Sequence, residues 1–553
     1  MKKTISVRIL AAAAAVTLLF AACRTGDSPS SRGGEANLPN TTGEAGFKKY
    51  DPPIDITMIK GIYPGTTDKF AALGESVEEN RWIDLFREEL GINIKYLWVA
   101  TIGDSYDTKV KLMFSSGTYP DLLGAGLGDM TQLAEADMIW DMTQVYKDNA
   151  SELTNNIIMA DGGLAYKACQ LDGKLMAVPQ VTSAYDTLRY MYIRTDWLEK
   201  LNLEPPKSMD DLHKIMEAFV KQDPDGNGKN DTYATYIDKG LWTQLEGYFW
   251  GFDAYPSAWL EKDGQLIYGS IQPEIKDALR SVQNMYKDGW LDPEFFIKPF
   301  QQAKEIVTKG KTGVVFGYHW MPLDVIGPQH QLEPDSDWGC FPIPSKREND
   351  PAKVCMQLGL NSALVVNKQC AYPEAAVEMM NLYFEKQFGE TADYGYWADD
   401  EEHNVQGVGQ LGPLYAFHPL ANLNPYRDVM KVHRGEMKVE DLKGASLHYY
   451  KENERDWEAR AMWGTGDHTA GTVLDFLDKN QHYIVRNAFV GAPTPTIVER
   501  GSTLEEIRAT TFTRIMSGEL DVDTAFDQFV SEWKRLGGDK MTAEVNEWYQ
   551  SNK

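Results

Sequence analysis

Short β-rich runs alternate with amphipathic segments through the body of the chain, and this alternation constrains the fold more than any other feature. Residues 54–60 and 92–99 predict strands from their alternating or β-rich side chains. The segment between them puts its large apolar side chains on one helical face and ends at Gly91. Residues 106–115 predict a further helix, and residues 121–123 open a third strand. This order predicts an α/β fold with a parallel sheet covered by helices.

The same alternation recurs further along the chain. Residues 190–194 predict a strand and residues 208–222 a helix. A third block predicts strands at 313–317 and 362–367 and a helix at 373–385. The chain therefore carries several α/β blocks in succession.

The C-terminal part predicts helices. Ser502 and Glu505 resemble a capping box, which would start a helix there. An apolar stripe at helical spacing follows, formed by Phe526, Phe529, Val530 and Trp533. We interpret these apolar faces as core.

Length and charge exclude several classes of protein. The 553 residues exceed the size of one ordinary domain, about 150 residues, and so predict more than one lobe. A net charge of −26 argues against a nucleic-acid partner, because phosphate contacts need a basic surface. A mean hydropathy of −0.42 and a single long apolar run exclude a polytopic membrane protein.

The N-terminus predicts export. Basic residues precede an apolar stretch at 9–22 that is short for a membrane span and typical of a signal peptide. The stretch ends in small residues before Cys23, which resembles a bacterial lipobox, with Phe20 in the slot where that pattern prefers Leu. A lipid on Cys23 would anchor the chain on the extracellular face of the membrane. The alternative is plain secretion with an incidental cysteine.

A polar tether is predicted to follow the anchor. Residues 24–46 are rich in Gly, Ser, Thr, Pro and Asn and contain no aromatic residue before Phe47. Such a composition predicts a flexible segment. We therefore expect a signal peptide at 1–22 and an anchored cysteine with its tether at 23–49. Removal of the signal peptide would lower the net charge to −29.

Four further cysteines lie in the body of the chain: Cys169, Cys340, Cys355 and Cys370. They show no C-x-x-C spacing, so a zinc site is not expected. A bridge between Cys340 and Cys355 and a set of buried thiols both remain open.

Several stretches together resemble extracellular solute-binding proteins of family 1, the maltose-binding-like class that serves ABC importers. Each stretch alone is weakly specific, and their order and spacing carry the resemblance over roughly residues 50–535. The stretches are G-T-Y-P-D-L at 117–122, D-G-K-L-M-A-V-P at 172–179, Y-I-R-T-D-W-L at 192–198, P-P-K-S at 205–208 and F-V-G-A-P-T-P-T at 489–496.

The resemblance implies a two-lobed periplasmic-binding-protein fold, type II-like, with a ligand cleft between lobes joined by crossing strands. Lobe one is expected at 50–183 plus 358–435. Lobe two is expected at 184–357 plus 436–553, with the C-terminal helices packed across both lobes. Closure of such lobes on a ligand is a hinge motion.

The resemblance also implies residues for sugar recognition. Carboxylates and amides bond to hydroxyls, aromatic rings cover the C–H face, and such polar groups reject ligands without the matching hydroxyl. Asp121 is expected to accept a hydroxyl, with a helix cap or turn residue as the alternative. Trp320 and His319 lie in a stretch that resembles the family's G-x-W, where an aromatic side chain stacks on the sugar. The alternative for Trp320 is core packing.

Other residues are weaker candidates for the ligand site. Trp242 and Trp250 fall in the aromatic stretch 241–252, where core packing is the stronger alternative for each. Tyr63 follows the first strand, and Trp463 lies in a Gly/Thr-rich stretch. Arg189 is expected at the first lobe crossing, where it meets either a ligand or a structural carboxylate.

Residues 223–231 predict a calcium site. Oxygen donors fall at positions 1, 3, 5 and 9 of an EF-hand-like loop, and position 7 would give a backbone carbonyl. Position 12 is Ala234 where an EF-hand has Glu, so the loop is not a sensor EF-hand and the predicted role of the calcium ion is structural. Thr232 follows position 9. The alternative is a metal-free Asx/Gly turn. The predicted ligands are Asp223, Asp225, Asn227, Lys229 and Asp231.

The sequence favours a binding protein over an enzyme. No G-x-S-x-G, H-E-x-x-H or P-loop motif is present, and no carboxylate pair stands out for glycoside hydrolysis. We expect a monomer that passes an oligosaccharide to the permease subunits of an ABC importer. An extracellular glycoside hydrolase, a structural lipoprotein, and a peptide or other solute as ligand are the alternatives. Acidic sugars remain possible, although the net charge opposes them at long range.

Overall fold

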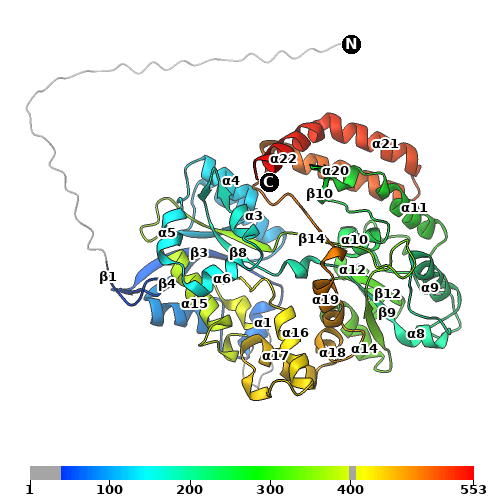
Figure 1. The fold of residues 1–553 in the computed structure, drawn as a ribbon, viewed down its shortest axis with the longest axis horizontal. Coiled ribbons are helices and arrows are strands. Elements are labelled where there is room, and N and C mark those ends of the chain that lie inside the picture. Colours follow the sequence, from blue (N-terminus) through cyan, green and yellow to red (C-terminus); the bar gives the residue numbers. More distant parts are fainter. Residues whose placement is uncertain (1–38, 398–406, 553) are drawn as a thin grey trace, which may run out of the picture. The chain divides into compact units, whose positions relative to one another are not determined.

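The computed structural model describes residues 39–397 and 407–552, without the side chains of Asp104, Trp242 and Thr243. The chain divides into two compact units, residues 1–39 and residues 40–553. The predicted signal peptide, Cys23 and the predicted tether up to residue 38 lie outside the described residues. All elements below belong to the second unit (Figure 1).

The first strands form a parallel pair, as predicted. β3 (Ile54–Ile62) pairs with β4 (Ile92–Thr101), with Ile54 opposite Ile92. The helix between them, α2 (Arg81–Leu85), runs on into a π-helical turn at Phe86–Leu90. The side chain of Asn80 caps its start, and Gly91 ends it with a left-handed φ of 66°.

A three-stranded antiparallel sheet completes this lobe. β15 (Leu360–Val366) lies between β5 (Leu122–Ala125) and β8 (Val178–Val181). Helix α15 (Ala375–Phe388) buries most of its length against the same core. The remaining elements are α1 (Thr66–Ala71), α3 (Asp104–Ser116), α4 (Leu127–Glu135), α5 (Thr143–Asn149), α6 (Glu152–Met159), α7 (Leu164–Ala168), β6 (Gln170–Leu171) and β7 (Lys174–Leu175).

The second lobe has an antiparallel sheet of its own. β9 (Tyr190–Arg194) lies between β12 (Val314–Gly317) and β13 (Trp338–Phe341). The predicted parallel order therefore holds for β3 and β4, whereas β5 and β9 pair antiparallel with strands from distant parts of the chain, whose direction the local pattern does not specify. The other elements are α8 (Thr195–Lys200), α9 (Met209–Lys221), α10 (Trp242–Trp250), β10 (Trp259–Lys262), β11 (Gln265–Tyr268), α11 (Glu274–Lys287), α12 (Phe300–Ala303), α13 (Glu305–Thr308) and α14 (Gly327–Leu332).

The C-terminal part is helical, as predicted. Thr494 caps the long helix α20 (Pro495–Met516), so the predicted start at Ser502 is wrong, because that serine lies inside the helix. Figure 1 shows α20 beside α11, α21 and α22. The other elements are β14 (Val354–Met356), α16 (Leu423–His433), α17 (Gly444–Arg455), α18 (Trp457–Trp463), α19 (Ala470–Lys479), β16 (Ile484–Arg486), α21 (Val522–Trp533) and α22 (Asp539–Ser551).

The buried residues form two hydrophobic cores, one for each lobe. One core draws on residues 50–181 and 363–416, and the other on residues 185–356 and 423–545. Helix α16 buries Leu423 and Tyr426 in the second core, although the predicted division assigned residues up to 435 to lobe one.

Within the described residues, three chain crossings join the lobes. The amide of Thr182 in the first crossing donates to the carbonyl of Gly359 in the second at 3.0 Å. The amide of Phe417 in the third crossing donates to the carbonyl of Val181 at 2.8 Å. The crossings therefore lie side by side, and the pocket described below borders them.

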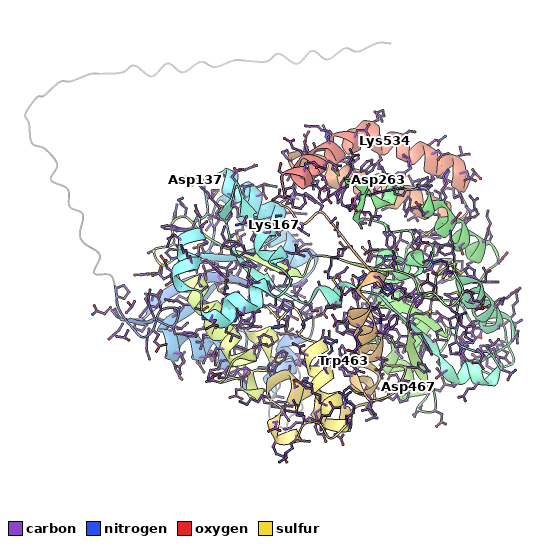
Figure 2. The ribbon with its side chains drawn as sticks, in the orientation of Figure 1. Asp137, Lys167, Asp263, Trp463, Asp467 and Lys534 are labelled. Carbon is purple, nitrogen blue, oxygen red and sulfur yellow. The ribbon has the colours of Figure 1, made fainter. Side chains whose placement is uncertain are left out.

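Both ends of the described chain are tied to lobe one. β1 (Asn40–Thr42) pairs with β2 (Lys49–Asp51), so residues 40–49, which were expected to belong to the tether, form most of a hairpin. Lys167, labelled in Figure 2, donates from Nζ to the carbonyl of Asn552 at 3.2 Å. Among the helices that the structure describes, none is long and apolar enough to cross a membrane.

Candidate functional site

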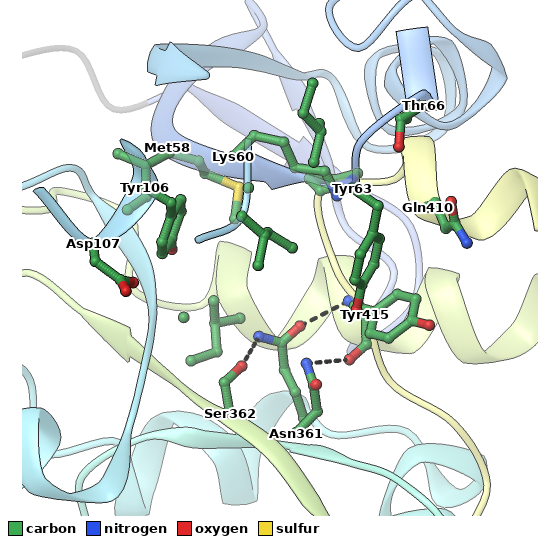
Figure 3. A pocket seen from close by; sticks show the side chains of 18 residues that line it. Met58, Lys60, Tyr63, Thr66, Tyr106, Asp107, Asn361, Ser362, Gln410 and Tyr415 are labelled. Atoms are coloured by element: carbon green, nitrogen blue, oxygen red, sulfur yellow. Dashed lines mark hydrogen bonds between the residues drawn. The ribbon is translucent and has the colours of Figure 1, made fainter. Parts of the chain in front are cut away.

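A cavity of about 350 Å³ opens beside the ends of β3 and β5, next to the crossings. This edge of an α/β sheet is where ligands are expected. In Figure 3, Tyr106 and Asp107 lie on one side of the cavity and Tyr63 and Tyr415 on the other. We call this cavity the lobe-one pocket. The lining residues that matter most below are Lys60, Tyr63, Gln180, Asn361, Ser362 and Tyr415.

Amides and hydroxyls in the pocket hold one another in place. Gln180 donates from Nε2 to Ser362 Oγ at 2.7 Å, and its Oε1 accepts the backbone amide of Tyr415 at 2.9 Å. Asn361 donates from Nδ2 to the carbonyl of Tyr415 at 3.2 Å (Figure 3). These bonds fix the third crossing to β8 and β15. The amides and hydroxyls that line the pocket are therefore held in one geometry.

Lys60 and Tyr63 give the pocket a cation and an open aromatic face. The side chain of Tyr63 is 49% exposed, so its ring is free to cover an apolar ligand surface. Lys60 is 8% exposed, and its Nζ donates to the carbonyl of Gly412. Burial lowers the pKa of Lys60 to about 8.

A second group of polar and aromatic residues lies in lobe two and at the crossings. We call it the lobe-two cluster, and it comprises Asp186, His319, Asn422, Tyr449 and Trp463. Asn422 donates to the carboxylate of Asp186, and Tyr449 donates from its hydroxyl to Asn422. His319 Nδ1 lies 3.9 Å from Asp186 Oδ1. The ring of Trp463 lies 5.3 Å from His319 and stacks on Tyr449 at 5.2 Å.

Burial sets the charge state of the cluster. It raises the pKa of Asp186, against the opposing effect of His319. It lowers the pKa of His319, which Asp186 partly offsets. Burial also raises the pKa of Tyr415 to about 12, with further contributions from Tyr63 and Asp186.

Trp320 belongs to a layered stack that begins in the lobe-two core. Arg189 pairs with Glu246 at 2.7 Å and lies 3.8 Å from the centre of the Tyr318 ring. Tyr318 in turn stacks on Trp320, with ring centres 5.1 Å apart and planes 15° apart. Tyr192 donates its hydroxyl to the carbonyls of Tyr318 and His319 at 3.1 and 3.0 Å. Tyr318 thus supports one face of the Trp320 ring, and Tyr192 fixes the backbone that precedes Trp320.

The predicted ligand residues fall in different surroundings. Tyr63 lines the lobe-one pocket, and His319 and Trp463 meet in the lobe-two cluster. The carboxylate of Asp121 accepts the amide and hydroxyl of Thr57 at 2.8 and 2.6 Å, which ties β3 to the start of β5. The guanidinium of Arg189 forms an ion pair with the carboxylate of Glu246.

The predicted tryptophans differ in how much surface they offer. Trp250 is fully buried in the lobe-two core, and Trp463 is 3% exposed beneath His319 and Tyr449. Trp320 is only partly buried and offers surface beyond Tyr318. The side chain of Trp242 lies outside what the structure describes.

Sequence patterns missed several residues of the site. Asn361 and Tyr415 carry no local signal, because β15 and the third crossing bring them to the pocket from distant parts of the chain. Asn422 and Tyr449 likewise meet only through tertiary packing. Lys60 did carry a signal, since it is the only basic residue of β3 and follows the apolar residues Met58 and Ile59.

A wider hollow of about 740 Å³ lies on lobe two, and it shares no residue with the lobe-one pocket or the lobe-two cluster. One of its cations, Arg347, is already paired with Asp253 at 2.9 Å and with Asp350 at 2.6 Å. A ligand there would compete with these internal pairs, so the lobe-one pocket is the better candidate.

The predicted calcium loop forms a compact turn. Asp223 accepts the amides of Asn227 and Gly228 at 3.0 and 2.9 Å. Asn227 donates from Nδ2 to Asp225 and Asp231 at 2.7 and 3.0 Å, and its Oδ1 accepts the amide of Lys229. The side chains that the sequence predicts as ligands are therefore gathered at one place.

A lysine lies among these donors. Lys311 Nζ is 2.9 Å from both carboxylate oxygens of Asp231 and 3.0 Å from Asp225. The hydroxyl of Thr232 is buried and donates to the carbonyl of Phe219 at 2.6 Å. The donors therefore suit calcium only where Lys311 gives way. Within residues 39–397 and 407–552, no cluster of three or more His, Cys, Asp or Glu side chains is arranged to hold a metal ion.

The four cysteines of the body are buried thiols. Cys169, Cys340, Cys355 and Cys370 are all free, so the open question of a Cys340–Cys355 bridge is answered in favour of thiols. Burial raises the pKa of Cys169 and of Cys370 to about 12.

Comparison with known proteins identifies the family. The model of the family described as bacterial extracellular solute-binding protein matches residues 63–388. Lipoprotein LipO of Bacillus subtilis (strain 168) is 23% identical over 486 residues, which are 84% of this chain and 87% of LipO.

Two solved structures share the fold. The S. pneumoniae ABC-transporter substrate-binding protein FusA in complex with kestose has a TM-score of 0.63 and 18% identity, over 90% of this chain and 100% of that one. The alginate-binding protein AlgQ2 without calcium ion has a TM-score of 0.61 and 16% identity, over 90% and 98%. These likenesses show a two-lobed α/β fold. The match over residues 63–388 shows that the chain belongs to the bacterial extracellular solute-binding protein family.

Proposed function

We propose that this protein captures an oligosaccharide between the lobe-one pocket and the lobe-two cluster and delivers it to the permease of an ABC importer. The observation that carries the proposal is the combination of the open Tyr63 ring with a fixed wall of amides and hydroxyls. Sugars need both an apolar face and matched hydrogen-bond partners. The similar structure of FusA holds kestose, a sugar.

Trp320 is proposed as the aromatic platform of lobe two, with His319 and Trp463 beside it. The stack under Trp320 fixes its plane before the ligand arrives, which lowers the ordering cost of binding. Asp121, Arg189, Trp242 and Trp250 stay predictions as ligand contacts.

The proposed location is the extracellular face of the membrane, with a lipid on Cys23 and a monomeric body. The similarity to a Bacillus lipoprotein supports the anchor. Palmitate labelling of the wild type and of Cys23→Ala in a bacterial host tests it. Loss of label in the variant is expected, and equal labelling would contradict the anchor.

Calorimetric titration of residues 24–553 with neutral and acidic oligosaccharides tests the function. Binding is expected to at least one sugar class and to weaken at least tenfold in Trp320→Ala. Trp290→Ala is the matched control, because Trp290 is also partly buried in lobe two but lines a different hollow. Failure of every sugar to bind, with peptides binding instead, would overturn the sugar proposal.

The protein is proposed to bind and not to cleave its ligand. Chromatography of each bound oligosaccharide after prolonged incubation should return it unchanged. Appearance of shorter products would favour a glycoside hydrolase.

We also propose a structural calcium ion at residues 223–231, with ligands from Asp223, Asp225, Asn227, Lys229 and Asp231. Two observations support it: the oxygen donors gather in one turn, and a similar structure is named for a form without calcium. Calcium would have to displace Lys311 from Asp225 and Asp231.

A further inference from the structure

Lys60 occupies an unusual position for a lysine. It lies near the end of β3, paired in register with Val99 of β4, and its side chain is 8% exposed at the wall of the lobe-one pocket. Its Nζ donates a hydrogen bond to the backbone carbonyl of Gly412. Figure 3 shows the side chain among the residues that face the cavity.

Lys60 also differs from every other buried cation that the structure describes. The others are Arg189, Arg194 and Arg508, and each pairs with a carboxylate within 3.1 Å. Lys60 forms no ion pair with any described carboxylate, and the lowered pKa of its amine has burial as its cause. The pocket therefore contains a cation for which residues 39–397 and 407–552 supply no counter-ion.

A buried charge without a counter-ion is costly, and proteins retain such groups mainly at functional sites. A carboxylate on the ligand would supply the missing charge. It would do so beside Ser362, Asn361 and Tyr63, which suit the hydroxyls and the ring of a sugar. Because Lys60 is one cation, it would pair with one carboxylate of the ligand in the lobe-one pocket.

We infer that the ligand is an acidic oligosaccharide and that the carboxylate of one uronic acid residue pairs with Lys60 in the lobe-one pocket. This inference rests on the proposed function and adds its substrate class. The net charge of −29 that the chain carries without its signal peptide repels such a ligand at long range, but salt screens that repulsion beyond about 8 Å. The contact pair with Lys60 acts within that distance.

Calorimetry with matched charged and neutral sugars tests the inference. Residues 24–553 are titrated with trisaccharides of galacturonate, mannuronate and glucuronate, with the methyl ester of each, and with neutral fructo- and galacto-oligosaccharides. One uronate is expected to bind at least tenfold more tightly than its ester in the wild type. Lys60→Met should remove that preference.

Lys95→Met is the control for net charge. Lys95 lies on the neighbouring strand, exposed and paired with Asp55, so its loss changes the total charge equally without touching the pocket. It should leave the preference for the uronate intact. An equal loss in both variants would attribute the preference to long-range charge and would overturn the role of Lys60.

Proton uptake gives a second, independent readout. Pairing with an anion should restore the pKa of Lys60 towards its ordinary range, so binding at pH 8 should take up about half a proton. Titrations in two buffers of different ionisation enthalpy measure this number, and Lys60→Met should show none. Tight binding of a neutral sugar without preference for any uronate would overturn the inference and leave the proposed function standing. Failure of every sugar to bind would overturn both.

Discussion

Arg189 and Glu246 form an ion pair at 2.7 Å in the core of lobe two, with their side chains 8% and 11% exposed. Burial raises the pKa of Glu246, and Arg189 opposes that rise. Because the guanidinium also covers the ring of Tyr318, the pair forms the base of the stack that ends at Trp320. Arg189 is thus suited to position the platform.

Breaking this pair should destabilise the protein strongly. Arg189→Met leaves the Glu246 carboxylate uncompensated and should lower the free energy of unfolding by about 3–5 kcal/mol at neutral pH. The loss should shrink as the pH falls, because a protonated Glu246 no longer needs a counter-charge. Urea unfolding at several pH values measures it. Recovery in Arg189→Met/Glu246→Leu is expected, whereas a double variant as unstable as the single one would contradict the ion-pair explanation.

Lys60→Met should stabilise the free protein. Burial lowers the folded-state pKa from 10.5 to about 8, so at pH 7 the charge costs roughly 3 kcal/mol. Between pH 8 and 10.5 the unfolded chain binds the extra proton, so the wild type should gain stability with rising pH. The two proteins should therefore converge as the pH approaches 10.5. Unfolding curves from pH 7 to 10 check this, and a constant difference would count against a charged Lys60.

Removal of Lys311 should raise the affinity of the loop at 223–231 for calcium. In Lys311→Met the carboxylates of Asp225 and Asp231 lose their internal cation, so calcium should bind at least tenfold more tightly than in the wild type. Without calcium, the variant should melt below the wild type. Calcium titration and thermal melts with and without EDTA measure both effects.

Lys309→Met is the control for that experiment, because Lys309 is exposed and pairs with Glu305. It should behave as the wild type. Equal calcium affinity in all three proteins would show that Lys311 does not compete with the metal.

Gly359 should tolerate no side chain at the second crossing. An added Cβ would lie 2.5 Å from the carbonyl oxygen of Thr182 and 2.9 Å from the amide of Ala184. Gly359→Ala should therefore cost about 1–3 kcal/mol of stability. Gly501→Ala is the matched change inside α20, where the Cβ would meet only an ordinary contact at 3.8 Å, and it should stabilise slightly. Denaturant midpoints compare the two, and equal effects would refute close packing at the crossing.

The four body cysteines should react with a thiol reagent only after unfolding. All four are buried, and burial holds the pKa of each thiol above its ordinary value. Reaction of the Cys23→Ala variant with Ellman's reagent, under native and denaturing conditions, counts accessible thiols. None is expected before unfolding and four after it. If only two thiols react after unfolding, the other two cysteines form a disulfide bridge.

Local sequence predicted most elements of the fold. Alternation marked β3, β4 and β9 close to their observed bounds, and Ser208 begins α9 by accepting the amide of Asp211. These features depend on neighbouring residues, so a single sequence contains the information. The start of α20 was missed because Thr494 followed by Pro495 is the stronger helix start.

Strand direction and the composition of the site depended on tertiary structure. The partners of β9 lie more than 100 residues further along the chain, and periodicity carries no information about which way they run. Asn361, Tyr415 and Asn422 likewise reach the site through the crossings.

The sequence by itself determined the α/β lobes, the family resemblance and the oxygen donors of the loop at 223–231, because each is written in short, contiguous patterns. Only the tertiary structure decided that Arg189 pairs with Glu246, that Lys311 lies among the loop carboxylates and that Lys60 is buried without a counter-ion from the part of the chain that the structure describes. Those facts depend on which side chains meet across distant segments and on how much water is excluded there. Burial and pairing set the energy of a charge, and neither quantity exists before the chain is folded.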